Sequence, residues 1–243
     1  MTRDCRLIGV GVGPGDPELM TLKAVRTLAA ADVLAYFAKA GKESNARQIA
    51  ASHIRPDVIE LPLGYPVTTE LARDDPAYRQ ATQAFFDNAA ATIAGQLDRQ
   101  RIVAVLSEGD PLFYGSYMHV HVRLADRYPT EVIAGVTSLS GCWSAAGIPI
   151  AQGDDILTVL PATLPQETLV SRLMTSDAAV MIKLGRNLAK ARRALAETGR
   201  LGSAIYVERG TMAAGRVLPL RDKPDDAAPY FAVVLVPGFA GQP

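Results

Sequence analysis

The chain has 243 residues, and its hydrophobic content of 49% is enough for one large domain or two smaller ones. Its 25 basic and 25 acidic residues cancel, which argues against a global attraction to nucleic acid or to membrane surfaces. Cys5 and Cys142 are too few for a disulfide framework, and His53, His119 and His121 do not form a metal-binding set, so we expect no metal.

No targeting segment is evident in the sequence. The first apolar run is short and is already interrupted at Gly9, unlike a secretory signal. Residues 132–153 carry no charge and are numerous enough to span a bilayer, but their glycines and Pro149 fit a glycine turn followed by a buried helix better. We therefore expect a cytoplasmic protein.

The first predicted strand, Cys5–Val12, runs into a glycine- and proline-rich loop at residues 13–17. Asp16 can cap a following helix, with Pro17 at its first position. The loop departs from the G-x-G-x-x-G dinucleotide fingerprint, which would require glycine at Pro14 or at Asp16. The loop therefore approaches something other than a phosphate, or it is tight only for packing.

Apolar periodicity then predicts an alternation of strands and helices. The predicted elements are a strand at 32–37, a helix at 42–54, a strand at 58–61, an irregular loop at 63–75, a helix at 76–100, a strand at 102–106 and a helix at 116–127. This order predicts a mostly parallel sheet covered by helices.

The strand at 102–106 breaks sharply into Ser107-Glu108-Gly109-Asp110-Pro111. Gly109 permits backbone conformations that a side chain disfavours, and Pro111 fixes its own φ. Open α/β sheets place ligands at such carboxyl ends of strands, so this turn is either a site or an ordinary strand-to-helix connection.

A domain boundary is predicted after Tyr128, giving domains 1–128 and 129–243. The second domain opens with a glycine turn at 135–141, in which Thr137 and Ser138 either bind a ligand or cap the following helix. Its predicted strands and helices lie at 156–160, 166–175, 178–182, 203–207, 216–220 and 230–236, with a basic helix after Lys183-Leu184-Gly185-Arg186-Asn187. The closing strands look antiparallel.

Three motifs resemble those of the S-adenosylmethionine-dependent methyltransferases that act on tetrapyrroles in cobalamin and sirohaem synthesis. They are Gly-Val-Gly-Pro-Gly-Asp at 11–16, Glu-Gly-Asp-Pro-Leu-Phe-Tyr-Gly at 108–115 and Gly-Val-Thr-Ser at 135–138. Four further stretches, at 141–147, 183–188, 206–211 and 228–231, resemble one branch of that family. The likeness covers nearly the whole chain.

This resemblance implies the tetrapyrrole methylase fold, with two α/β domains, a cofactor cleft between them and a homodimer. It implies S-adenosylmethionine as methyl donor, held by Pro14, Glu108, Gly109, Asp110, Phe113, Thr137, Ser138, Leu184 and Gly210. A sulfonium cofactor brings a positive centre and no phosphate, which agrees with the acidic residues in these turns.

The branch likeness implies methylation of C20 of precorrin-2, giving precorrin-3A. Candidates for the base that accepts the released proton are Glu108, Asp110, Tyr114 and Glu208, with water as an alternative. Because the substrate carries carboxylates, Lys183, Arg186 and Arg209 are candidate substrate-binding residues, or else ordinary surface charges.

The sequence also allows two alternative functions. The nearer is a sister methyltransferase that acts on cobalt-factor II or on another ring position. The farther is a nucleotide-binding oxidoreductase or a tetrapyrrole carrier without catalytic activity.

Overall fold

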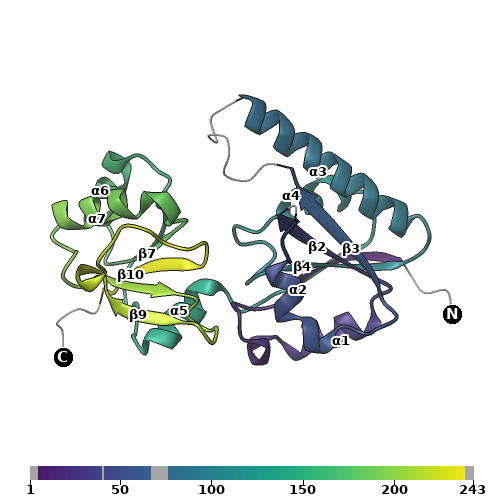
Figure 1. The fold of residues 1–243 in the computed structure, drawn as a ribbon, viewed down its shortest axis with the longest axis horizontal. Coiled ribbons are helices and arrows are strands. Elements are labelled where there is room, and N and C mark those ends of the chain that lie inside the picture. Colours follow the sequence, from purple (N-terminus) through teal and green to yellow (C-terminus); the bar gives the residue numbers. More distant parts are fainter. Residues whose placement is uncertain (1–4, 40, 67–75, 239–243) are drawn as a thin grey trace. The chain divides into compact units, whose positions relative to one another are not determined.

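The computed structural model describes residues 5–39, 41–66 and 76–238, and the chain folds into two compact units (Figure 1). The first unit runs to Thr137 and the second begins at Ser138. The sequence places the boundary earlier, after Tyr128. The structural boundary lies later because strand β5 (Thr130–Ile133) pairs with β1 (Arg6–Gly11) and so belongs to the first sheet.

The first unit is an α/β layer structure built on a parallel sheet. The described strands have the order β3-β2-β4-β1-β5, and every pairing between them is parallel. The other elements are α1 (Leu22–Ala30), β2 (Val33–Lys39), α2 (Asn45–Ile49), β3 (Ile59–Tyr65), α3 (Pro76–Leu97), β4 (Ile102–Ser107) and α4 (Tyr117–Leu124). The predicted alternation is confirmed.

Two apolar clusters hold the helices of the first unit to the two faces of the sheet. One joins α3 and α4 to residues such as Leu7 and Val105, and the other joins α1 and α2 to residues such as Val10 and Leu106. Neighbouring residues of one strand supply opposite faces, as the two-residue period of a strand requires. The sheet is thereby buried on both faces, which explains the nearly continuous apolar strands in the sequence.

Two local expectations for the first unit need correction. Residues 63–65 were expected in an irregular loop, but β3 continues through them because it pairs with β2 as far as Lys39 and Tyr65. The helix expected at 42–54 is shorter, because its regular part is α2 and a 3-10 turn follows at Ala51–His53. The rest of the expected loop, residues 67–75, lies outside the described residues.

The second unit carries a mixed sheet with the order β6-β7-β10-β8-β9. Its elements are α5 (Ser138–Ala146), β6 (Leu157–Pro161), α6 (Gln166–Met174), β7 (Ala178–Ile182), α7 (Leu188–Glu197), β8 (Ile205–Glu208), β9 (Arg216–Pro219) and β10 (Ala232–Val236). The β6–β7 pair is parallel, whereas β10 pairs antiparallel with β7 and β8, and β8 pairs antiparallel with β9. The predicted antiparallel closing strands are confirmed.

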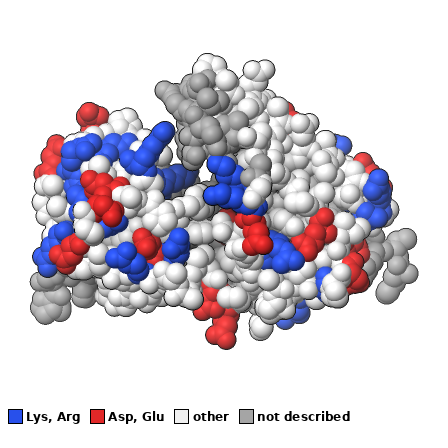
Figure 2. Space-filling view, viewed as in Figure 1, with Lys and Arg blue, Asp and Glu red and all other residues white. Residues whose placement is uncertain are grey.

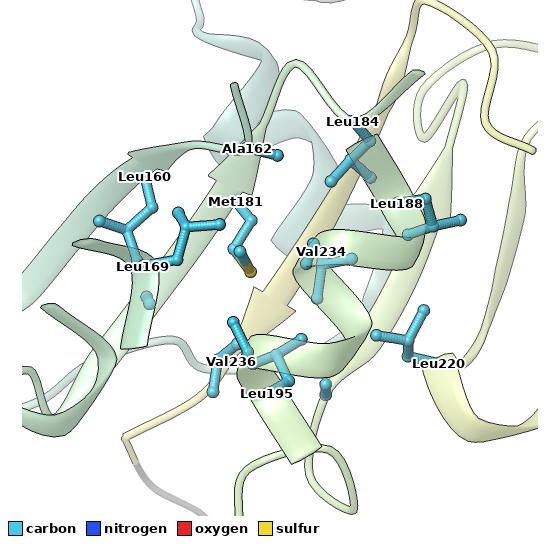
Figure 3. Close-up of a cluster of buried hydrophobic side chains, with 14 of the residues drawn as sticks. Leu160, Ala162, Leu169, Met181, Leu184, Leu188, Leu195, Leu220, Val234 and Val236 are labelled. Atoms are coloured by element: carbon cyan, nitrogen blue, oxygen red, sulfur yellow. The ribbon is translucent and has the colours of Figure 1, made fainter. Parts of the chain in front are cut away.

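The second unit has its own cores. Figure 3 shows the larger one, in which Leu188 and Leu195 of α7 pack with Met181 and Val234 of the sheet. A smaller cluster on α5 contains Leu139 and is separate from it. In neither unit does the described chain contain a helix long and apolar enough to cross a membrane.

Candidate functional site

Three glycine-containing turns meet at the carboxyl end of the first sheet. A Cβ on Gly11 would lie 2.6 Å from the Gly109 carbonyl oxygen and 2.6 Å from the Gly135 Cα. A Cβ on Gly135 would collide with the same Gly109 oxygen. The turns that follow β1, β4 and β5 make this close contact, called the glycine crossing below, only because Gly11 and Gly135 lack side chains.

Hydrogen bonds lock these turns together. The Gly109 N–H donates to the Gly13 carbonyl at 2.8 Å, and both residues have left-handed φ values of 65° and 81°. The Asp110 carboxylate accepts from the Gly135 N–H at 3.1 Å and from the Leu112 N–H at 2.9 Å. Asp110 thus ties its own loop to the turn after β5, which makes it a structural organiser of this edge.

Asp16 has the capping role that its sequence position predicts. Its side chain accepts from the Glu18 N–H at 2.9 Å and caps the 3-10 turn Pro17–Leu19. The first regular helix, α1, begins later and is capped by Thr21 instead. Pro14 is half-buried and lies directly after the left-handed Gly13.

Glu108 lies between the end of β4 and Gly109. Burial raises the pKa of its carboxyl group, and hydrogen bonds from the Asn45 side chain and from the backbone of Ala46 partly oppose that rise. Asn45 and Ala46 begin α2, so the carboxylate is held by a helix of the same unit. Sequence reasoning missed this partnership, since nothing in the helix expected at 42–54 marks Asn45.

The loop after Asp110 exposes three consecutive large apolar side chains. Leu112, Phe113 and Tyr114 are 48%, 36% and 46% exposed. The rings of Phe113 and Tyr114 meet edge to face, with centroids 4.9 Å apart. This loop therefore presents an apolar surface directly beside the glycine crossing.

The second unit carries the remaining predicted residues at its own strand ends. Lys183 and Leu184 follow β7, and Arg209 and Gly210 follow β8. Leu184 is 1% exposed and its side chain belongs to the core of the second unit. A Cβ on Gly210 would lie 3.1 Å from the Cys142 sulfur, which shows that α5 packs tightly on this turn.

The carboxylate of Glu208, a candidate base, is already hydrogen-bonded within the second unit. The Glu208 carboxylate accepts from the Tyr206 hydroxyl at 2.7 Å and lies 4.0 Å from the Arg216 guanidinium. These contacts occupy the carboxylate of Glu208 and weaken its candidacy as a base.

Arg186 is exposed in the 3-10 turn after β7, and Figure 2 shows basic side chains gathered over the α6 and α7 side of this unit.

The predicted site residues divide between the two units. The first unit holds Pro14, Glu108, Gly109, Asp110, Phe113, Tyr114 and Thr137, and the second holds Ser138, Lys183, Leu184, Arg186, Glu208, Arg209 and Gly210. Within the first unit the crossing of β1, β4 and β5 brings the turns of the three motifs together. Thr137 and Ser138 stand on either side of the unit boundary.

Comparison with known proteins gives a consistent result. The family model for tetrapyrrole (corrin/porphyrin) methylases matches residues 6–223. A Sinorhizobium precorrin-2 C(20)-methyltransferase is 59% identical, over 98% of this chain and 97% of the relative. A cobalt-precorrin-2 C(20)-methyltransferase of Salmonella typhimurium is 25% identical, over 95% of each chain. The solved structure of a cobalt precorrin-4 methyltransferase, 20% identical, shares the fold with a TM-score of 0.72 over 96% of this chain and 94% of that one.

Proposed function

Because the chain belongs to the tetrapyrrole (corrin/porphyrin) methylase family, we propose that it transfers a methyl group from S-adenosylmethionine to C20 of precorrin-2, giving precorrin-3A in cobalamin biosynthesis. It is an S-adenosylmethionine-dependent C-methyltransferase. The observation that carries the proposal is the 59% identity, over nearly the full length of both chains, with a relative of that activity.

The residues at the carboxyl end of the first sheet suit a sulfonium cofactor. The absence of side chains at Gly11 and Gly135 lets the turns after β1, β4 and β5 come together, which gathers the three motifs at one edge of the sheet. The neighbouring carboxylates of Glu108 and Asp110 favour a positive centre over a phosphate. We assign Pro14, Glu108, Gly109, Asp110, Phe113 and Thr137 of the first unit to the cofactor, together with Ser138, Leu184 and Gly210 of the second.

When bound, the cofactor supplies a methyl group that an electron-rich meso carbon of the reduced tetrapyrrole can attack in line. The contribution of the protein is then alignment, which can supply roughly 7–11 kcal/mol of the barrier. A positioned base for the released proton adds about 10²–10⁴-fold. Among the candidates Glu108, Asp110, Tyr114 and Glu208, the raised pKa of Glu108 favours that residue, because a stronger base accepts a proton more readily.

Selection of one carbon requires that the ring be held in register. We assign Lys183, Arg186 and Arg209 to the peripheral carboxylates, with Arg186 as the principal clamp because guanidinium groups bind carboxylates in a bidentate way. The segment 65–69 of the first unit is the proposed opposing clamp. Tyr65 is described, and its hydroxyl contacts that of Ser116, whereas residues 67–69 lie outside the described residues.

Incubation with precorrin-2 and methyl-labelled S-adenosylmethionine, followed by NMR of the product, tests the assignment. A product methylated at another carbon would contradict it. Parallel reactions with metal-free and cobalt-loaded substrate distinguish the sister activity on cobalt-factor II. The identity of 59% to a precorrin-2 enzyme, against 25% to a cobalt-precorrin-2 enzyme, supports the metal-free substrate. Calorimetry with S-adenosylhomocysteine distinguishes a carrier, which needs no cofactor site, and binding would also count against an oxidoreductase.

Two further properties belong to this proposal. We expect a homodimer in the cytoplasm, on the basis of the family resemblance. Sedimentation at micromolar concentration that gave only a monomer of 25.9 kDa would contradict the dimer.

A further inference from the structure

In the described part of the chain, three of the four non-glycine residues with a left-handed backbone lie in turns proposed for the site. Among the described residues, the non-glycine positions with positive φ are Gln100 (58°), Tyr114 (55°), Lys183 (58°) and Arg209 (48°). Gln100 ends the turn that closes helix α3, where such a conformation is common. The other three follow β4, β7 and β8, in turns where the site is proposed. Strain that persists in a fold is typical of functional positions.

Tyr114 differs from Lys183 and Arg209 because its left-handed backbone carries an exposed aromatic side chain. Tyr114 is 46% exposed, and its ring lies against that of Phe113 in a loop that also exposes Leu112. A tyrosine gains nothing from a left-handed backbone in the absence of a contact that needs its ring, and glycine would occupy the position without strain. The conformation therefore indicates that the ring itself is required.

The backbone just before Tyr114 is held by Asp110, the same residue that joins the turns after β4 and β5. Asp110 accepts from the Leu112 N–H through its carboxylate and from the Phe113 N–H, at 3.3 Å, through its carbonyl. A Cβ on Gly115 would lie 3.1 Å from the Pro111 carbonyl oxygen, so the loop is also tight on its far side. Tyr114 thus stands in a loop whose backbone is held on both sides by local contacts.

We propose that Tyr114 is a substrate-positioning residue whose ring packs against the face of the tetrapyrrole macrocycle. This inference rests on the proposed function. Charged clamps can hold the carboxylates at the periphery of the macrocycle, but its broad apolar face needs an apolar partner, and an aromatic ring supplies a large contact area in few rotamers. The role differs from that of a base, because it uses the ring and not the hydroxyl.

Three variants separate the ring, the hydroxyl and the backbone strain. Tyr114→Gly removes the ring and relieves the strain, so we expect unchanged or increased resistance to urea, a KM for the tetrapyrrole raised at least tenfold, and S-adenosylhomocysteine affinity within about threefold of wild type. Tyr114→Phe keeps the ring and should keep KM near the wild-type value. Gln100→Gly is the matched control, because it relieves the same kind of strain away from the loop and should leave KM unchanged.

Binding of uroporphyrin, a fluorescent porphyrin with carboxylate side chains, gives a readout independent of turnover. We expect Tyr114→Gly to weaken its binding at least tenfold and Tyr114→Phe to leave it within about threefold. Unchanged KM and porphyrin affinity in Tyr114→Gly would overturn the inference. Equal losses of porphyrin affinity in Tyr114→Phe and Tyr114→Gly would assign the role to the hydroxyl. A parallel loss of S-adenosylhomocysteine affinity would assign Tyr114 to the cofactor turn. Either result overturns the inference. A wild-type enzyme that binds the porphyrin but does not methylate precorrin-2 would contradict only the proposed function.

Discussion

Replacing Gly11 by alanine tests whether the close crossing of three turns builds the cofactor site. The new methyl group would lie 2.6 Å from backbone atoms of both Gly109 and Gly135, whereas ordinary contacts begin at 3.4 Å. The neighbouring backbone would have to move by roughly 0.8 Å, the difference between those distances. All the close atoms are backbone atoms of strand ends, which cannot rotate away as a flexible side chain can.

Overpacking of this kind costs about 1–3 kcal/mol, so we expect the free energy of unfolding of Gly11→Ala to fall by that amount in urea titrations. Displacement by about 1 Å can cost roughly 10²-fold in rate, and we expect a loss of similar order in S-adenosylhomocysteine affinity, measured by calorimetry. The matched control is Gly64→Ala in β3, where a Cβ meets nothing within 4 Å. That variant should keep cofactor affinity and should be neutral or about 0.4–1 kcal/mol more stable.

Wild-type stability and wild-type affinity in Gly11→Ala would contradict this prediction, because the turns would then separate at no cost. The prediction also fails if Gly64→Ala loses cofactor affinity to the same extent. In that case the effect would belong to the sheet in general and not to the crossing.

Three further variants or reactions test Arg186, Glu108 and Cys142. Arg186→Ala should lower kcat by up to roughly 10²-fold and raise KM while cofactor affinity stays unchanged, because a lost clamp disturbs alignment as well as binding, and unaltered kinetics would show a merely solvated arginine. Burial raises the pKa of Glu108, so the folded state binds its proton more tightly than the unfolded state, and the associated stability is lost as pH rises above the unfolded value. Urea titrations should therefore show Glu108→Gln gaining stability relative to wild type as the pH rises above the ordinary pKa of a glutamate, and a pH-independent difference would contradict this. Burial raises the pKa of Cys142 to about 11, so native protein should react with iodoacetamide at this position far more slowly than unfolded protein, as mass spectrometry of the modified peptide can measure.

The class of fold and the turns that carry the motifs could be predicted from the amino-acid sequence. Apolar runs that end in glycine turns predicted β1, β4 and β7 close to their observed bounds, because burial on both faces of a sheet leaves a pattern that is local in sequence. The motifs at Gly109 and Gly135 were identified as candidate sites for the same reason, since each turn follows its strand directly.

Which turns touch, and which groups hold the acidic residues, became clear from the folded chain. The close contact of Gly11 with Gly109 and Gly135 joins turns that lie far apart in the sequence, and no local pattern encodes their distance. The Asn45 contact to Glu108 and the continuation of β3 through Tyr65 likewise depend on a neighbouring element. Pairing between strands and desolvation of a carboxylate are properties of the assembled core, whereas the sequence specifies directly only the local preferences from which that core is built.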